Sequence, residues 1–248
     1  MCKHWPTAPK EITLPKNEVH VYSVSLDCSQ AKRDTFWTML SGNERDRAKR
    51  FYFDHDRHHY IVARGTLRVL NGRYLSLSPS QIQFTYGEHG KPALAAQHNQ
   101  NNNILEFNLS HAHGMALVGF SWNRPLGIDI EPVRPLDDAE NIASRFFSAW
   151  EYEQYTAVSD QDKPQAFFNC WTRKEAYIKA IGDGLTCPLN AFDLTLTPGK
   201  PANLLKIRGS QSEAAKWQLH SLLPYDNYIG AIIAKGKDWQ LQKWHWAT

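Results

Sequence analysis

Hydrophobic residues recur with a helical period over residues 165–181. The apolar positions are Phe167, Phe168, Trp171, Ile178 and Ile181. Asp162 suits the N-cap of such a helix, Pro164 its first turn, and Gly182 or Gly184 its end. The pattern predicts a helix that buries one side. Glu175 and Lys179 lie four residues apart on one face of it, in the order that favours an ion pair, so an ordinary surface pair is the simplest interpretation.

An alternating pattern over residues 126–131 predicts a strand that Pro132 stops. Its period of two places Asp129 and Glu131 on one face and apolar residues on the other. Two neighbouring carboxylates repel each other, and a hard divalent cation would relieve that repulsion. The alternative is a solvated edge face.

The order of predicted elements is similar in the two halves of the chain. A strand at 18–26 and a helix at 31–40 precede a capping box of Ser41 and Glu44, a long helix at 57–75, and strands at 82–86, 104–109 and 115–122. Ser148 and Glu151 form a second capping box before the helix at 165–181, and strands follow at 192–196, 217–222 and 228–234. This predicts a duplicated α+β fold, with similar subdomains at 1–124 and 125–248 related by a pseudo-twofold axis.

The two ends of the chain are expected to pack on this body. Residues 1–17 contain three prolines and are predicted to form an extended lead-in. Trp239, Trp244 and Trp246 crowd the C-terminus, which indicates a tail packed against the core.

Composition narrows the function classes. The net charge of +3 suits an anionic ligand or an acidic partner, but it is too low for a nucleic-acid binder. The four cysteines lack metal-ligand spacing and are expected to be reduced thiols: Cys2, Cys28, Cys170 and Cys187. Since no signal-type or membrane-spanning apolar run occurs, we expect a cytoplasmic protein that does not enter a membrane.

Two further patterns suggest chemistry that we consider and set aside. His55, His58 and His59 lie close together but do not complete a four-ligand zinc set. Ser110 and His111 are adjacent on a predicted strand, so they point to opposite faces, and no nucleophile elbow surrounds the serine. A zinc site and a serine hydrolase are therefore both disfavoured.

Four motifs together carry a family resemblance. They are Gly127-Ile-Asp129-Ile-Glu131, Trp171-x-x-Lys174-Glu175-Ala-x-x-Lys179, Gly90-Lys91-Pro92 and Asn108-Leu-Ser110-His111. The set resembles the 4'-phosphopantetheinyl transferases of the surfactin-synthetase type, and it spans about residues 44–185. The resemblance implies a fused pseudo-dimer, hence a monomer, with its active site in the cleft between the halves.

The resemblance also implies a reaction and a set of site residues. The 4'-phosphopantetheine group would pass from coenzyme A to a serine hydroxyl of an acyl or peptidyl carrier protein, leaving 3',5'-ADP. Asp129, Glu131 and Glu175 would hold Mg²⁺, Glu175 would be the base, and Lys179 would face the leaving phosphate. The residues assigned to coenzyme A are Arg47, Lys91, Pro92, Ser110, His111, Lys174 and Lys179.

The chain departs from the family pattern at two positions, where Glu44 replaces a lysine and His59 an arginine. Both departures concern the part of the site expected to hold the 3'-phosphate. A carrier protein is acidic, so its docking surface should be basic with an apolar centre, and residues 145–155 supply aromatic side chains for it. The alternative function is a non-catalytic coenzyme A or nucleotide-binding module of the same fold.

Overall fold

A computed structural model describes residues 5–99 and 103–247. Cys2, one of the four expected thiols, lies outside the described residues. Cys28, Cys170 and Cys187 are free, and Cys170 and Cys187 are buried.

Each half of the chain runs from one long strand through helices to further strands. The first half contains β1 Glu18–Ser25, α1 Gln30–Met39, α2 Gly42–Lys49, α3 Asp54–Leu75, η1 Pro79–Gln81, β2 Phe84–Tyr86, β3 Pro92–Leu94, η2 Ala96–His98, β4 Leu105–Ala112 and β5 Met115–Trp122. The second half contains β6 Leu126–Pro132, α4 Ala139–Phe146, α5 Ala149–Thr156, α6 Lys163–Ile181, η3 Gly184–Thr186, η4 Leu189–Ala191, β7 Phe192–Leu194, β8 Leu204–Ile207, α7 Gln211–Ala214, β9 Trp217–Leu222, β10 Tyr228–Lys235 and β11 Gln240–Trp246.

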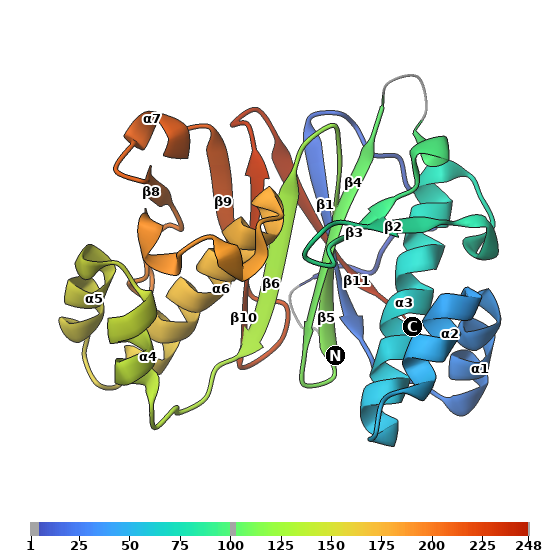
Figure 1. The fold of residues 1–248 in the computed structure, drawn as a ribbon, viewed down its shortest axis with the longest axis horizontal. Coiled ribbons are helices and arrows are strands. Elements are labelled where there is room, and N and C mark those ends of the chain that lie inside the picture. Colours follow the sequence, from blue (N-terminus) through green and yellow to red (C-terminus); the bar gives the residue numbers. More distant parts are fainter. Residues whose placement is uncertain (1–4, 100–102, 248) are drawn as a thin grey trace.

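The two halves repeat one topology. Strands β1, β5 and β4 form adjacent members of one sheet, and β6, β10 and β9 form the other in the matching order. Each half also has a two-stranded hairpin, β2–β3 or β7–β8. Helices α1–α3 and α4–α6 lie on opposite outer sides of the molecule (Figure 1). The predicted α+β class and the two similar subdomains are thereby confirmed.

The capping boxes are also repeated, and each glutamate carries a second structural role. Glu44 caps α2 and accepts hydrogen bonds from the guanidinium groups of Arg64 and Arg68 on α3. Glu151 caps α5 and pairs with Lys174 on α6, with 2.6 Å between Nζ and Oε2. In both halves, therefore, a buried ion pair ties a short helix to the long one. This pairing accounts for Glu44 as a structural residue.

The halves join along β4 and β6. Asn108 Oδ1 accepts the Ile128 N–H, and Ser110 Oγ donates to Asp129, so the two strands lie side by side with their numbering rising together. An apolar core between the sheets includes Val19, Val21, Leu117, Ile128, Ile130, Ile232 and Trp239.

The last strand leaves its own half. The expected C-terminal tail is β11, which pairs in parallel with β1 of the first sheet. The lead-in runs beside it, since the Ala8 N–H donates to the His245 carbonyl and the His245 N–H to the Pro6 carbonyl. The boundary at residue 125 falls in the turn between β5 and β6, but residues 240–246 belong to the sheet of the first half.

Candidate active site

Strand β6 and helix α6 bring four charged side chains together. A Cβ on Gly127 would lie 2.0 Å from the Ala176 carbonyl oxygen, so only glycine lets α6 pack directly on the β6 backbone. Asp129 and Glu131 follow on the same face of β6. The close packing places Glu175 and Lys179 next to these carboxylates.

Lys179 reaches across the strands instead of forming only a helical surface pair. Its Nζ lies 2.6 Å from Asp129 Oδ1 and 2.9 Å from Ser110 Oγ. Ser110 in turn donates to Asp129 Oδ1 at 2.8 Å. The simplest interpretation of Glu175 and Lys179, an ordinary surface pair, does not describe this geometry.

The cluster holds more negative charge than its protein cations neutralise. Burial raises the pKa of Glu131 to about 7, and Asp129 and Glu175 act in the same direction while Lys179 and Arg134 oppose them. Burial also raises the pKa of Glu175, with Lys179 opposing and Asp129 adding to the shift. The second carboxylate oxygen of Asp129, Oδ2, is buried without a hydrogen-bond partner.

These features fit a hard divalent cation, which prefers carboxylate oxygens and would satisfy the orphaned Oδ2. Binding of such a cation requires the Lys179 side chain to move, because its Nζ now contacts Asp129 Oδ1. Within residues 5–99 and 103–247, no three histidine, cysteine or acidic side chains are close enough to hold a metal ion as they stand. Among these residues, His55, His58 and His59 form no such group.

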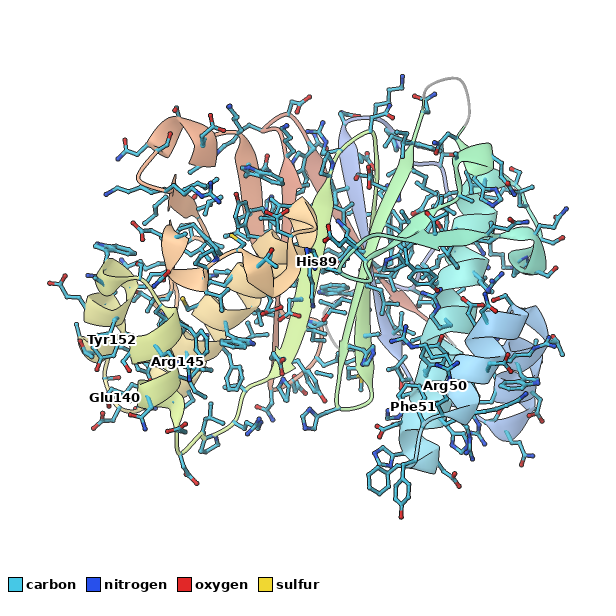
Figure 2. The ribbon with its side chains drawn as sticks, in the orientation of Figure 1. Arg50, Phe51, His89, Glu140, Arg145 and Tyr152 are labelled. Atoms are coloured by element: carbon cyan, nitrogen blue, oxygen red, sulfur yellow. The ribbon has the colours of Figure 1, made fainter. Side chains whose placement is uncertain are left out.

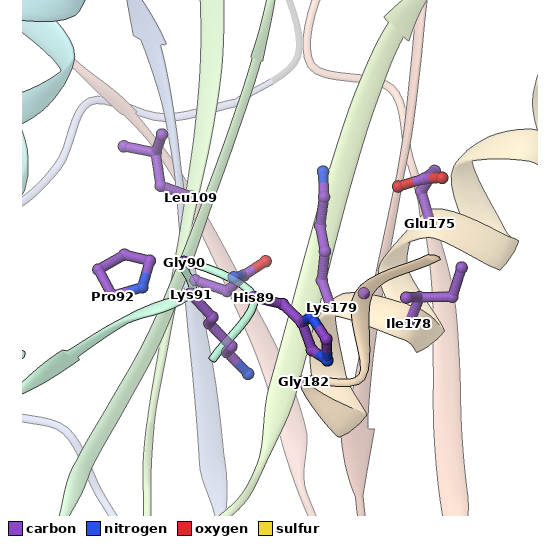
Figure 3. A pocket seen from close by; sticks show the side chains of 11 residues that line it. His89, Gly90, Lys91, Pro92, Leu109, Glu175, Ile178, Lys179 and Gly182 are labelled. Carbon is purple, nitrogen blue, oxygen red and sulfur yellow. The ribbon is translucent and has the colours of Figure 1, made fainter. Parts of the chain in front are cut away.

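A pocket of about 260 Å³ opens beside Glu175 and Lys179 (Figure 3). Its opposite wall is the Gly90–Pro92 turn with Asn108 and Leu109, and His89 reaches across toward α6 in the close-up view. The Lys91 ammonium donates to the Leu126 and Ala180 carbonyl oxygens, which ties the turn to β6 and α6. Lys91 and Pro92 thus line one pocket with residues of the second half.

His111 and Arg47 are not among the residues that line this pocket. His111 is exposed at the end of β4, and partial desolvation lowers its pKa, helped by the positive charges of Lys179 and His59. His59 Nε2 lies 3.0 Å from Asp27 Oδ1. Arg47 is exposed, with its guanidinium over the Tyr60 ring.

Lys174 requires a correction. Its side chain is 0% exposed, and its Nζ donates to the Leu189 and Phe192 carbonyl oxygens besides pairing with Glu151. All three donor positions are therefore used inside the second subdomain. We remove Lys174 from the coenzyme A ligands, because burial and pairing leave it nothing to offer a ligand.

Sequence reasoning also left residues unassigned. Asn108 lines the pocket and links β4 to β6, yet within its motif we gave it no role. His89 precedes the Gly-Lys-Pro turn, and its packing against Gly184, which has φ +55°, closes one end of the pocket. The turn motif was the only signal for His89.

None of the helices among the described residues combines the length and apolar character needed to cross a membrane.

The two halves match two family models. The model for the N-terminal region of 4'-phosphopantetheinyl transferases matches residues 27–120, and the model for the 4'-phosphopantetheinyl transferase superfamily matches residues 125–233. Among solved structures, holo-[acyl-carrier-protein] synthase from Thermotoga maritima aligns with 46% of this chain and 63% of that one, at 22% identity and a TM-score of 0.33. That score is too low to bear on the fold.

Curated relatives match over longer stretches. The 4'-phosphopantetheinyl transferase HetI of Nostoc sp. is 38% identical over 247 residues, which cover 99% of this chain and 100% of HetI. The 4'-phosphopantetheinyl transferase Sfp of Bacillus subtilis is 32% identical over 178 residues, covering 71% of this chain and 76% of Sfp. This chain belongs to the 4'-phosphopantetheinyl transferase superfamily.

Proposed function

We propose that this chain transfers the 4'-phosphopantetheine group of coenzyme A to a serine hydroxyl of an acyl or peptidyl carrier protein and releases 3',5'-ADP. The relatives named above support transferase activity. The observation that carries the chemistry is the meeting of Asp129, Glu131, Glu175 and Lys179 beside one pocket between the halves. A diphosphate needs both cations and fixed donors, and this site offers them.

Asp129, Glu131 and Glu175 are the proposed Mg²⁺ ligands. The excess negative charge and the orphaned Asp129 Oδ2 support them. When bound, Mg²⁺ would neutralise pyrophosphate charge and stabilise the leaving phosphate. Lys179 would exchange its contact with Asp129 for one with the phosphate, since its partly exposed ammonium can turn toward the pocket.

The coenzyme A nucleotide is proposed to lie in the pocket along the Gly90–Pro92 turn. The pocket has apolar walls that suit a base, from Pro92, Leu109 and Ile178. Ser110 and His111 follow the pocket residues Asn108 and Leu109 on β4, and we assign them to the nucleotide phosphates. Arg47 is assigned to the same phosphates because its exposed cation is available to an anion.

Glu175 is the proposed base for the carrier serine. A serine hydroxyl is a weak nucleophile near neutral pH, and a carboxylate whose pKa is raised toward neutrality is a better proton acceptor there. Attack on the phosphorus would form the new phosphodiester and break the pyrophosphate bond, with Lys179 beside the departing oxygen.

The carrier protein is proposed to dock on α4 and α5. Of the aromatic residues there, Phe147 and Tyr155 are core, whereas Trp150 is 38% exposed. Arg145 is exposed and lies over the Phe146 ring, and Figure 2 shows it on this half of the molecule. An exposed cation beside aromatic surface suits an acidic helical partner.

We further propose that the enzyme acts as a monomer, because one chain supplies both walls of the site. We also propose that it works in the cytoplasm.

The competing function is a coenzyme A-binding module without transfer. The two are separated by measuring 3',5'-ADP released from coenzyme A by chromatography, with an apo carrier protein and with its serine-to-alanine form as control. Transfer predicts release that needs the serine. Binding of coenzyme A without serine-dependent release would support the non-catalytic module.

A further inference from the structure

The long helices α3 and α6 end in the same way. Ser76 and Gly182 are left-handed C-caps, and their N–H groups bond to the fourth residue before them. Arg73 and Lys179 each lie three residues before the cap. By this alignment Arg73 occupies in the first half the position that Lys179 occupies in the active site.

The neighbouring strands correspond as well. At the active site, β4 lies beside β6 with rising numbering in both. In the first half β11 lies parallel beside β1, with Trp246 opposite Val24. Strand β11 therefore lies beside β1 as β4 lies beside β6. Residues 7–10 of the lead-in line the pocket of the first half, as the Gly90–Pro92 turn lines the active-site pocket.

A second pocket, of about 350 Å³, lies at this related position. Its walls are α1, the end of α3, the end of β11 and residues 7–10, and its lining contains three cations and no carboxylate: Lys10, Lys32 and Arg73. Buried rings support two of these cations: the Arg73 guanidinium lies 4.4 Å from the Trp246 ring centroid and the Lys32 ammonium 5.6 Å from that of Phe36.

The residues that would hold a metal are missing here. Val69 stands at the helix position that corresponds to Glu175. On β1, the residues facing α3 are His20 and Tyr22, which hydrogen-bond to Tyr74, while Glu18 is bound to His20. The pocket thus retains cations and apolar lining without the carboxylate cluster that the proposed chemistry needs.

We propose that this second pocket binds a nucleoside phosphate without a metal and without reacting. The cations suit the phosphate, because Arg73 presents a planar donor fork and Lys10 and Lys32 add charge. Met39 and Val69 are half-buried in the pocket lining and offer an apolar wall for the base. The volume is within the range of roughly 300–1,000 Å³ usual for small-molecule sites.

The test is calorimetric titration of 3',5'-ADP in EDTA. Lys179→Met serves as the background, because it weakens the active site. This protein should keep one binding site, and adding Arg73→Gln or Lys10→Gln should weaken that site about tenfold or more, as expected for a lost charged contact to phosphate. Lys10 lies in the extended lead-in, so its change keeps the test valid if Arg73→Gln impairs folding. Arg33→Gln, a surface arginine outside the pocket, is the matched control and should have no effect.

Two further readouts separate this site from the active site. Arg73→Gln in the otherwise unchanged enzyme should leave the rate of phosphopantetheine transfer as it was. Inorganic phosphate and adenosine, each tested alone, should bind more weakly than the nucleotide. The proposal is overturned if the Lys179→Met protein binds no nucleotide, if the pocket substitutions leave its affinity unchanged, or if inorganic phosphate alone binds as tightly.

Discussion

Replacing Lys174 by methionine should damage the fold and spare the chemistry. Methionine matches the length and the apolar stem of lysine but removes the charge and three donors. The loss leaves Glu151 buried without its cation, and leaves the Leu189 and Phe192 carbonyl oxygens without these donors. Glu151 would keep its bonds from the backbone N–H groups of Ser148 and Leu194, and these uncharged donors do not replace the lost cation.

The expected cost follows from complete burial. Both side chains of the pair are 0% exposed, so water cannot replace the lost partner. Breaking a buried pair on one side costs about 3–5 kcal/mol. For a chain of this size each kcal/mol lowers the melting temperature by about 2–4 °C, which predicts a fall of about 6–20 °C.

The matched control is Lys179→Met, the same substitution on the same helix. Lys179 is 30% exposed, so its loss should lower the melting temperature by much less, yet it should abolish most of the transfer rate. The two variants should therefore show opposite patterns in calorimetry and in a carrier-loading assay.

The destabilisation caused by Lys174→Met should also depend on pH. Burial raises the pKa of Glu151, and Lys174 opposes that shift. Without the lysine the raised pKa increases further, so the destabilisation is greatest above it and shrinks as the pH falls and Glu151 takes up a proton. A Lys174→Met protein that melts normally but has a raised KM for coenzyme A would refute this reasoning and restore Lys174 to the binding site.

Three other substitutions probe the packing, the pH response and the base. Gly127→Ala forces a Cβ against the Ala176 carbonyl, so the urea midpoint should fall by the equivalent of about 1–3 kcal/mol, and an unchanged midpoint would contradict the close packing. Burial lowers the pKa of His20 below 6.5, so the unfolded state binds more protons there than the folded state. The stability that neutral His20 allows is therefore lost as the pH falls below 6.5. The melting temperature of His20→Gln should depend less on pH than that of the unchanged protein, and an equal dependence would argue against this. Glu175→Gln should slow transfer about 10²–10⁴-fold with little change in coenzyme A affinity, and an equal loss of both would count against the base.

Local signals explain why much of the fold was predictable. The capping residues Ser41 and Ser148 start α2 and α5 as their sequence patterns predicted. The strand expected at 126–131 is β6 at Leu126–Pro132, and the helix expected at 165–181 is α6 at Lys163–Ile181. The caps, the strand and the helix each depend on interactions between residues close in sequence, so a local pattern of residue types predicts them.

Long-range pairing explains what could not be predicted. The parallel pairing of β11 with β1 joins opposite ends of the chain, and no local period specifies a partner so distant. The burial of Lys174 did leave a signal, because it lies four residues from both Cys170 and Ile178 and so shares their buried face. The capping-box pattern assigns its partner Glu151 only to the start of α5, and no local pattern specifies a contact between α5 and α6.

The candidate site was predictable only as a set of motifs. The four motifs named Asp129, Glu131, Glu175 and Lys179, but spacing alone could not show that Lys179 contacts Asp129 and Ser110. The contact with Ser110 crosses from the second half of the chain to the first, so it depends on how the two sheets meet.

The most direct measurement is the intact mass of a purified apo acyl carrier protein after incubation with this protein and coenzyme A, with Mg²⁺ or with EDTA. Our account predicts a gain of about 340 Da, one phosphopantetheine group, that requires the metal and the carrier serine. No gain with several carrier proteins, while coenzyme A still binds, would contradict the account and leave a binding module in place of a transferase.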